Sequence, residues 1–155
     1  MKCNKRNFWV LLLLMAILLP RYADAGDYTC PPTPPEADGP FYRPNAPVRH
    51  TLGTGYLLTG EVKSAADCKP VRGAKIEIWM AGPDGVYGDR WRATTFAGRD
   101  GNYRFTSHIP GNYGSRPPHI HLIVSAPGFR ELITQHYQKP GHHEAIFDLV
   151  LIPGQ

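Results

Sequence analysis

The chain has 155 residues, the length of a single domain, and 42% of them are hydrophobic. Its formal net charge of +4 at pH 7 comes mostly from residues 1–25, where four basic residues face one acidic residue. No basic stripe remains in the rest of the chain, which argues against a nucleic acid as partner.

Residues 1–25 have the pattern of a secretory signal peptide. Lys2, Lys5 and Arg6 precede the apolar run FWVLLLLMAILLP, and ADA at 23–25 supplies the small residues of a cleavage site. The apolar run is short for a membrane span. We therefore expect an exported protein, periplasmic or extracellular, that has no membrane segment after cleavage.

The next segment, residues 26–55, is predicted to be an extended, proline-rich arm. Its part CPPTPPEADGPFYRPNAPVR (30–49) contains too many prolines for a helix or a central strand. Cys30 lies at the start of this part, and Cys68 is the other cysteine left after signal cleavage. In an oxidising compartment such a pair predicts a disulfide, and no CxxC spacing indicates a metal site.

Residues 56–155 are predicted to form one domain, in which seven short segments have strand character and none has convincing helical character. AKIEIWMA alternates well, with Ile76, Ile78 and Met80 on one face. Short strands separated by Gly/Pro turns favour an all-β sandwich or barrel. The segments are YLLTGEVK (56–63), AKIEIWMA (74–81), WRATTF (91–96), NYRFTS (102–107), HIHLIVSA (119–126), RELITQHY (130–137) and AIFDLVLI (145–152).

Two histidines in RPPHIHLIV (116–124) are candidate metal ligands. On a strand His119 and His121 project to the same side, while Ile120 points to the other. By itself an HxH pair also occurs on solvated strand faces, so the pair leaves both interpretations open.

Two tyrosines stand in Gly-rich loops before this strand, Tyr87 in GPDGVYGDRW and Tyr113 in IPGNYGSRPP. Each alone is typical of a surface residue that covers a hydrophobic edge. Together with the histidines they suggest a different role. A phenol has a pKa near 10 and loses its proton at neutral pH when a hard cation binds it. Phenolate oxygen with imidazole nitrogen suits ferric iron better than zinc.

The order of these motifs resembles the intradiol ring-cleavage dioxygenases, the family of catechol 1,2-dioxygenase and protocatechuate 3,4-dioxygenase. The resemblance rests on TPPEADGPFY (33–42), then G-x-Y, P-G-x-Y, R-P-x-H-I-H and T-Q-x-Y, and it extends over almost the whole chain after residue 25. It implies a single β-sandwich that holds non-haem Fe(III). The ligands it implies are Tyr87, Tyr113, His119 and His121.

The same resemblance implies roles for further residues. Arg116 would stabilise negative charge on the substrate ring, Gln135 would position substrate and oxygen, and Tyr113 would leave the metal to act as general base. The implied substrates are a small aromatic ortho-diol and O2. The ring would be cleaved between the two hydroxyl-bearing carbons to a muconate-type dicarboxylate. The oligomeric state stays open.

A second interpretation is an exported, transthyretin-like binding module without catalysis. The segment CKPVRGAKIEIW is similar to strands of such modules. This interpretation explains a sandwich but not the ordered tyrosines and histidines. Colour distinguishes the two, since tyrosinate bound to Fe(III) makes a protein red-brown.

Overall fold

The computed structural model describes residues 27–154, so the expected signal peptide at 1–25 lies outside the described residues. Within this range there is no helix, and hence none long and apolar enough to cross a bilayer. The strands are β1 (Thr51–Leu52), β2 (Tyr56–Ser64), β3 (Lys75–Ala81), β4 (Tyr87–Phe96), β5 (Asn102–Ser107), β6 (His119–Ser125), β7 (Leu132–Tyr137), β8 (Glu144–Ile146) and β9 (Leu149–Leu151).

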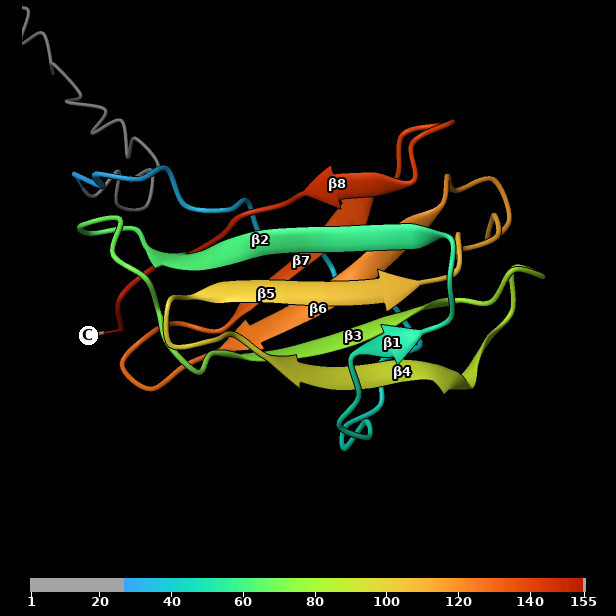
Figure 1. Cartoon of the computed structure of the whole chain (residues 1–155), viewed down its shortest axis with the longest axis horizontal. Helices are drawn as coiled ribbons and strands as arrows, with labels where there is room; N and C mark the ends of the chain where they lie inside the picture. The colour runs from blue at the N-terminus through green and yellow to red at the C-terminus, as the bar shows by residue number, and fades with distance from the viewer. Residues whose placement is uncertain (1–26, 155) are drawn as a thin grey trace, which may run out of the picture.

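The strands form two sheets that pack face to face, which confirms the predicted all-β sandwich (Figure 1). One sheet has the order β1-β5-β2-β8, with β9 also paired to β2, and the other has the order β4-β3-β6-β7. Both inner faces are lined with apolar side chains. The core includes Leu58 of β2, Phe105 of β5, Ile78 of β3 and Leu122 of β6, each at most 1% exposed.

The strands differ from the sequence prediction in three larger respects, besides shifts of one or two residues at other ends. The short β1 was not predicted, and β4 begins at Tyr87 rather than at residue 91. The predicted strand 145–152 is two strands, because the chain between them turns its polar groups to β2. There the Phe147 amide donates to the Thr59 carbonyl at 2.7 Å, and the Asp148 carboxylate accepts from Lys63 at 2.8 Å.

Strand β6 is buried on both faces, and this double burial positions the histidines. Its core-facing residues include Ile120 and Leu122, each 0% exposed. His119 and His121 face away from the core, yet they are only 3% and 2% exposed. Another part of the chain must therefore cover the outer face of the β4-β3-β6-β7 sheet.

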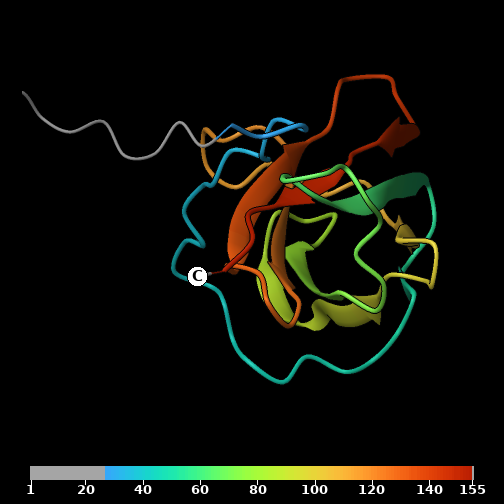
Figure 2. The ribbon, with the colours of Figure 1, turned by 90° about the vertical axis from the view of Figure 1, so that its left-hand side faces the viewer.

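That cover is the segment 30–49, which we call the strap. It starts beside β9, where the Thr33 amide donates to the Val150 carbonyl, and then follows β7, where the Glu36 amide donates to the Ile133 carbonyl. It crosses the outer face and reaches β4, where Arg49 donates to the Thr94 carbonyl. In Figure 2 this blue-to-cyan segment runs around the outside of the sandwich.

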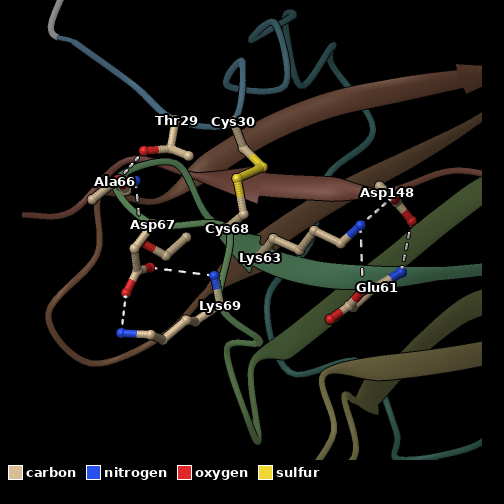
Figure 3. The surroundings of a disulfide bond; sticks show 10 residues. Thr29, Cys30, Glu61, Lys63, Ala66, Asp67, Cys68, Lys69 and Asp148 are labelled. Carbon is tan, nitrogen blue, oxygen red and sulfur yellow. Dashed lines mark hydrogen bonds and ion pairs between the residues drawn. A yellow bond between two sulfur atoms is a disulfide. The ribbon is translucent and has the colours of Figure 1, made fainter.

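A disulfide between Cys30 and Cys68 fastens the start of the strap to the loop after β2 (Figure 3). The two Cα atoms are 5.4 Å apart, and the Cys30 amide donates to the Ala65 carbonyl at 3.1 Å. The Thr29 hydroxyl donates to the Ala66 carbonyl at 2.7 Å. The disulfide predicted from the cysteine pair is therefore present in the structure.

A half-buried histidine between the sheets predicts acid sensitivity of the fold. His136 Nε2 lies 2.7 Å from Tyr56 Oη, and burial lowers the pKa of His136 to about 4 from 6.5. The unfolded chain therefore binds more protons than the folded chain below pH 6.5, so the stability from this group is lost as the pH falls from 6.5 toward 4. Between pH 6.5 and pH 4 we expect the melting temperature (Tm) of His136→Gln to fall less than that of the wild-type protein. His142→Gln, at an exposed turn, is the control, and an unchanged Tm–pH profile for His136→Gln would contradict the expectation.

Candidate metal centre

The outer face of the β4-β3-β6-β7 sheet brings four side chains into one row. The register pairs Trp79 of β3 with both Arg92 of β4 and His121 of β6, and His121 with Gln135 of β7. Trp79 is stacked on the His121 ring, with centroids 4.7 Å apart and planes 10° apart. This stacking holds the His121 ring in one orientation.

Tyr87 contributes its hydroxyl to the two histidines. Its Oη atom lies 3.1 Å from Nε2 of His119 and 3.1 Å from Nε2 of His121, and the two Nε2 atoms are also 3.1 Å apart. Phe41 of the strap stacks on the Tyr87 ring with centroids 4.3 Å apart and planes 11° apart. One oxygen and two nitrogens therefore converge on a single point beneath the strap.

The protonation of the histidines suits a metal. Nδ1 of His119 lies 2.8 Å from the Pro117 carbonyl, which can only accept, so Nδ1 carries the proton and Nε2 keeps its lone pair. Burial lowers the pKa of His119, and it lowers the pKa of His121 to about 3. Both rings are therefore neutral at pH 7 and both can donate lone pairs. Nδ1 of His121 is buried without a partner among the described residues, so the stack on Trp79 rather than a hydrogen bond at Nδ1 orients that ring.

The electrostatics around Tyr87 place two further expected residues at the same point. Burial raises the pKa of Tyr87 to about 12, the positive charge of Arg116 acts to lower it, and Tyr113 acts to raise it. Without a cation the phenol therefore keeps its proton at neutral pH. A bound cation would favour the ionised phenolate, and anionic oxygen is a ligand that hard cations prefer.

Tyr113 and Arg116 lie at the two ends of one tight turn. The Arg116 amide donates to the Tyr113 carbonyl at 3.0 Å, and Gly114 inside the turn has a φ of 57°. The Tyr113 ring meets the Tyr87 ring edge to face at a centroid distance of 5.5 Å. Tyr113 is 40% exposed, and its hydroxyl makes no hydrogen bond within residues 27–154. The structure thus joins three of the four expected ligand atoms and places the fourth ring beside them.

This site contains Gln135, which the sequence predicted, and two residues that it did not predict, Tyr137 and Glu36. Gln135 is 5% exposed and accepts from Arg116 at 2.7 Å, as expected for two residues of one site. Arg116 also donates to Tyr137 at 3.0 Å, and Tyr137 donates to Glu36 of the strap at 2.9 Å. Tyr137 belongs to the pattern T-Q-x-Y, and its i+2 spacing from Gln135 was the signal that could have placed it on the same strand face. No sequence signal pointed to Glu36.

Comparison with known protein families gives one family model that matches. It is described as Dioxygenase and covers residues 37–150, which is most of the chain. A catechol 1,2-dioxygenase from Pseudomonas sp. (strain EST1001) is 34% identical over 66% of this chain and 46% of its own length. A chlorocatechol 1,2-dioxygenase from Cupriavidus pinatubonensis is 30% identical over 69% of this chain and 55% of its own length. The chain thus spans about half the length of these relatives.

Two solved structures are similar over nearly their whole length. The dioxygenase domain of a dioxygenase carbohydrate-binding protein fusion from Streptomyces sp. SirexAA-E is 30% identical, with a TM-score of 0.72 over 80% of this chain and 100% of that one. An intradiol ring-cleavage dioxygenase from Tetranychus urticae has a TM-score of 0.70 over 80% of this chain and 96% of that one. The latter is 20% identical, so it supports the fold alone.

Proposed function

This chain belongs to the intradiol ring-cleavage dioxygenase family, and from that premise we propose that it is an Fe(III) enzyme that cleaves catechol-type rings with O2. The observation that carries the proposal is the convergence of Tyr87 Oη, His119 Nε2 and His121 Nε2, each 3.1 Å from the other two. Two neutral imidazoles and a phenol that only a hard cation would ionise form a donor set that fits ferric iron.

The proposed reaction is balanced without an external electron donor. The bond between the two hydroxyl-bearing ring carbons breaks, and both atoms of O2 enter the product as parts of its two carboxyl groups. Fe(III), when bound, supplies a Lewis acid that favours the ionised diol and enables its reaction with O2. Tyr87, His119 and His121 would hold it, with Tyr113 as the fourth ligand.

The remaining residues have proposed roles that follow from their positions. Tyr113 is exposed and next to Tyr87, and its Oη atom would take up a proton from the diol. Arg116 presents a fixed positive charge near the Tyr87 oxygen, where the negative charge of the diol would develop. Gln135 holds Arg116 through its Oε1 atom and lies beside His121 on the same face.

We also propose that the protein acts outside the cytoplasm, in the periplasm or the extracellular space. The disulfide between Cys30 and Cys68 supports this proposal, because the reducing cytoplasm of most organisms keeps thiols reduced. The sequence pattern of residues 1–25 agrees with it.

We expect the iron-loaded protein to be red-brown and to consume O2 when given catechol, a methylcatechol or protocatechuate. The aromatic absorption band of the diol should disappear as O2 is taken up in equal molar amount. An oxygen electrode and an ultraviolet spectrum measure both quantities in one sample. A colourless protein that leaves all three diols intact after loading with iron would contradict the proposed function and favour a binding module.

A further inference from the structure

Arg116 has an exposed side chain, yet one of its nitrogens has two partners. Nη2 donates to Oε1 of Gln135 at 2.7 Å and to Oη of Tyr137 at 3.0 Å. No hydrogen bond joins Nε or Nη1 to another side chain of the described part of the protein, so both stay available for a ligand. An exposed arginine without partners would sample many rotamers. The two bonds therefore restrict where its charge lies.

The chemistry of the partners fixes the direction of the hydrogen bonds that Gln135 and Arg116 make in this network. Nε2 of Gln135 donates to the Ala37 carbonyl at 2.7 Å, so the Oε1 end of the amide faces Arg116. The Tyr137 oxygen accepts from Arg116, and its own proton has two acceptors in reach, Oε2 of Glu36 at 2.9 Å and, at a longer distance, Oε1 of Gln135 at 3.2 Å. A carboxylate accepts only, so the chain of donors ends at Glu36.

Glu36 itself lies on a fixed piece of backbone. Its amide donates to the Ile133 carbonyl at 2.8 Å, and the Thr134 hydroxyl donates to the Pro34 carbonyl at 3.0 Å. The strap is thus attached to β7 at and just before Glu36. The Tyr137 ring, in addition, lies 5.8 Å from the His119 ring. Tyr137 therefore connects the strap with both the guanidinium and a candidate ligand.

We propose that Tyr137 and Glu36 are positioning residues, which hold the Arg116 guanidinium where it stabilises charge on the bound diol. This inference rests on the proposed function, because Arg116 has this task only in a ring-cleaving enzyme. Neither residue contacts the diol. Glu36 of the strap holds Tyr137, and Tyr137 in turn holds Arg116. The strap thereby contributes to catalysis through the position of the guanidinium.

The first test is the variant Tyr137→Phe in the iron-loaded protein. We expect kcat to fall about 10- to 100-fold, the usual effect of a misplaced catalytic group. Iron content should stay unchanged, and the anaerobic dissociation constant of a nitro-substituted catechol should change by less than about threefold, because the lost interaction acts in the transition state. Glu36→Gln, which keeps an acceptor but loses the charge, should lower kcat less. Tyr28→Phe and Glu144→Gln are the matched controls.

A double-mutant cycle separates positioning from a merely structural role. Arg116→Lys keeps the charge but lacks the planar guanidinium whose Nη2 atom meets both Gln135 and Tyr137. If Tyr137 acts through Arg116, adding Tyr137→Phe to Arg116→Lys should reduce kcat little further. If instead the two reductions multiply as for independent sites, the proposal is overturned.

The position of Arg116 can also be measured without turnover. In a crystal structure of Tyr137→Phe we expect the guanidinium to have moved away from its place beside Gln135. An undisplaced guanidinium would overturn the inference even if the wild-type protein cleaves catechols. A displaced guanidinium in a protein that cleaves no diol would support the positioning and count against the proposed function alone.

Discussion

Tyr87→Phe is expected to bleach the iron-loaded protein and to abolish ring cleavage. The phenylalanine ring can keep the stack on Phe41 and the edge contact with Tyr113, so the change removes one oxygen and little packing. That oxygen is the one that lies 3.1 Å from both Nε2 atoms of the histidine pair. Iron affinity should therefore fall by more than the roughly 10–100-fold that follows loss of an outer-shell partner.

Three measurements on the same preparation check this result: iron per chain by elemental analysis, the visible charge-transfer band, and O2 uptake with catechol. Tyr28→Phe, outside the site, should keep all three. The melting temperature of metal-free Tyr87→Phe should lie close to that of the metal-free wild-type protein, because the hydroxyl makes no other contact among the described residues. A Tyr87→Phe protein that keeps iron, colour and wild-type turnover would exclude the proposed centre.

Removing the disulfide should cost the fold about 3–4 kcal/mol, the loop-closure estimate for the sequence separation of 38 between Cys30 and Cys68. The loss should appear as a lower urea midpoint for Cys30→Ser/Cys68→Ser. Besides this loss of stability, the double variant should lose part of its capacity to hold iron. The bond fastens the start of the strap, and the strap supplies Phe41 against Tyr87 and Glu36 against Tyr137. We therefore expect weaker iron retention than in the wild-type protein at the same temperature.

A reducing agent provides the matched control for this prediction. Dithiothreitol should lower the urea midpoint of the wild-type protein to that of the double variant and leave the variant unchanged. Equal midpoints for the oxidised wild-type protein and the variant would show that the disulfide does not stabilise the fold. An unchanged iron affinity with a lowered midpoint would show that the strap stays in place without the bond.

The sandwich and the disulfide follow from local signals. The alternation in AKIEIWMA placed Ile76, Ile78 and Met80 on one face, and all three are in the core. The pair Cys30 and Cys68 was the even pair remaining after residues 1–25, so its bonding needed no knowledge of the fold. The i+2 spacing of the histidines likewise placed their side chains on the same face of β6.

Other features of the site depend on contacts between distant segments. Glu36 and Tyr137 are 101 residues apart, and no periodicity or motif in either segment points to the other. Tyr87 was expected in a loop, but it begins β4, which pairs with β3 through an irregular register between Trp79 and Ala81. Trp79 shares a strand face with Lys75 and Glu77, and a tryptophan on such a polar face was the one sequence signal that this face is covered.

The double burial of β6 limits how the length of this chain can change. A one-residue insertion or deletion inside its seven residues would exchange the two faces, moving the imidazoles into the apolar interior and Ile120 and Leu122 to the outer surface. Such a change would remove the metal ligands and the core contacts at once. Changes of length are therefore expected in connecting loops away from the candidate site, such as residues 138–143, and family members should vary in length there rather than within the strand.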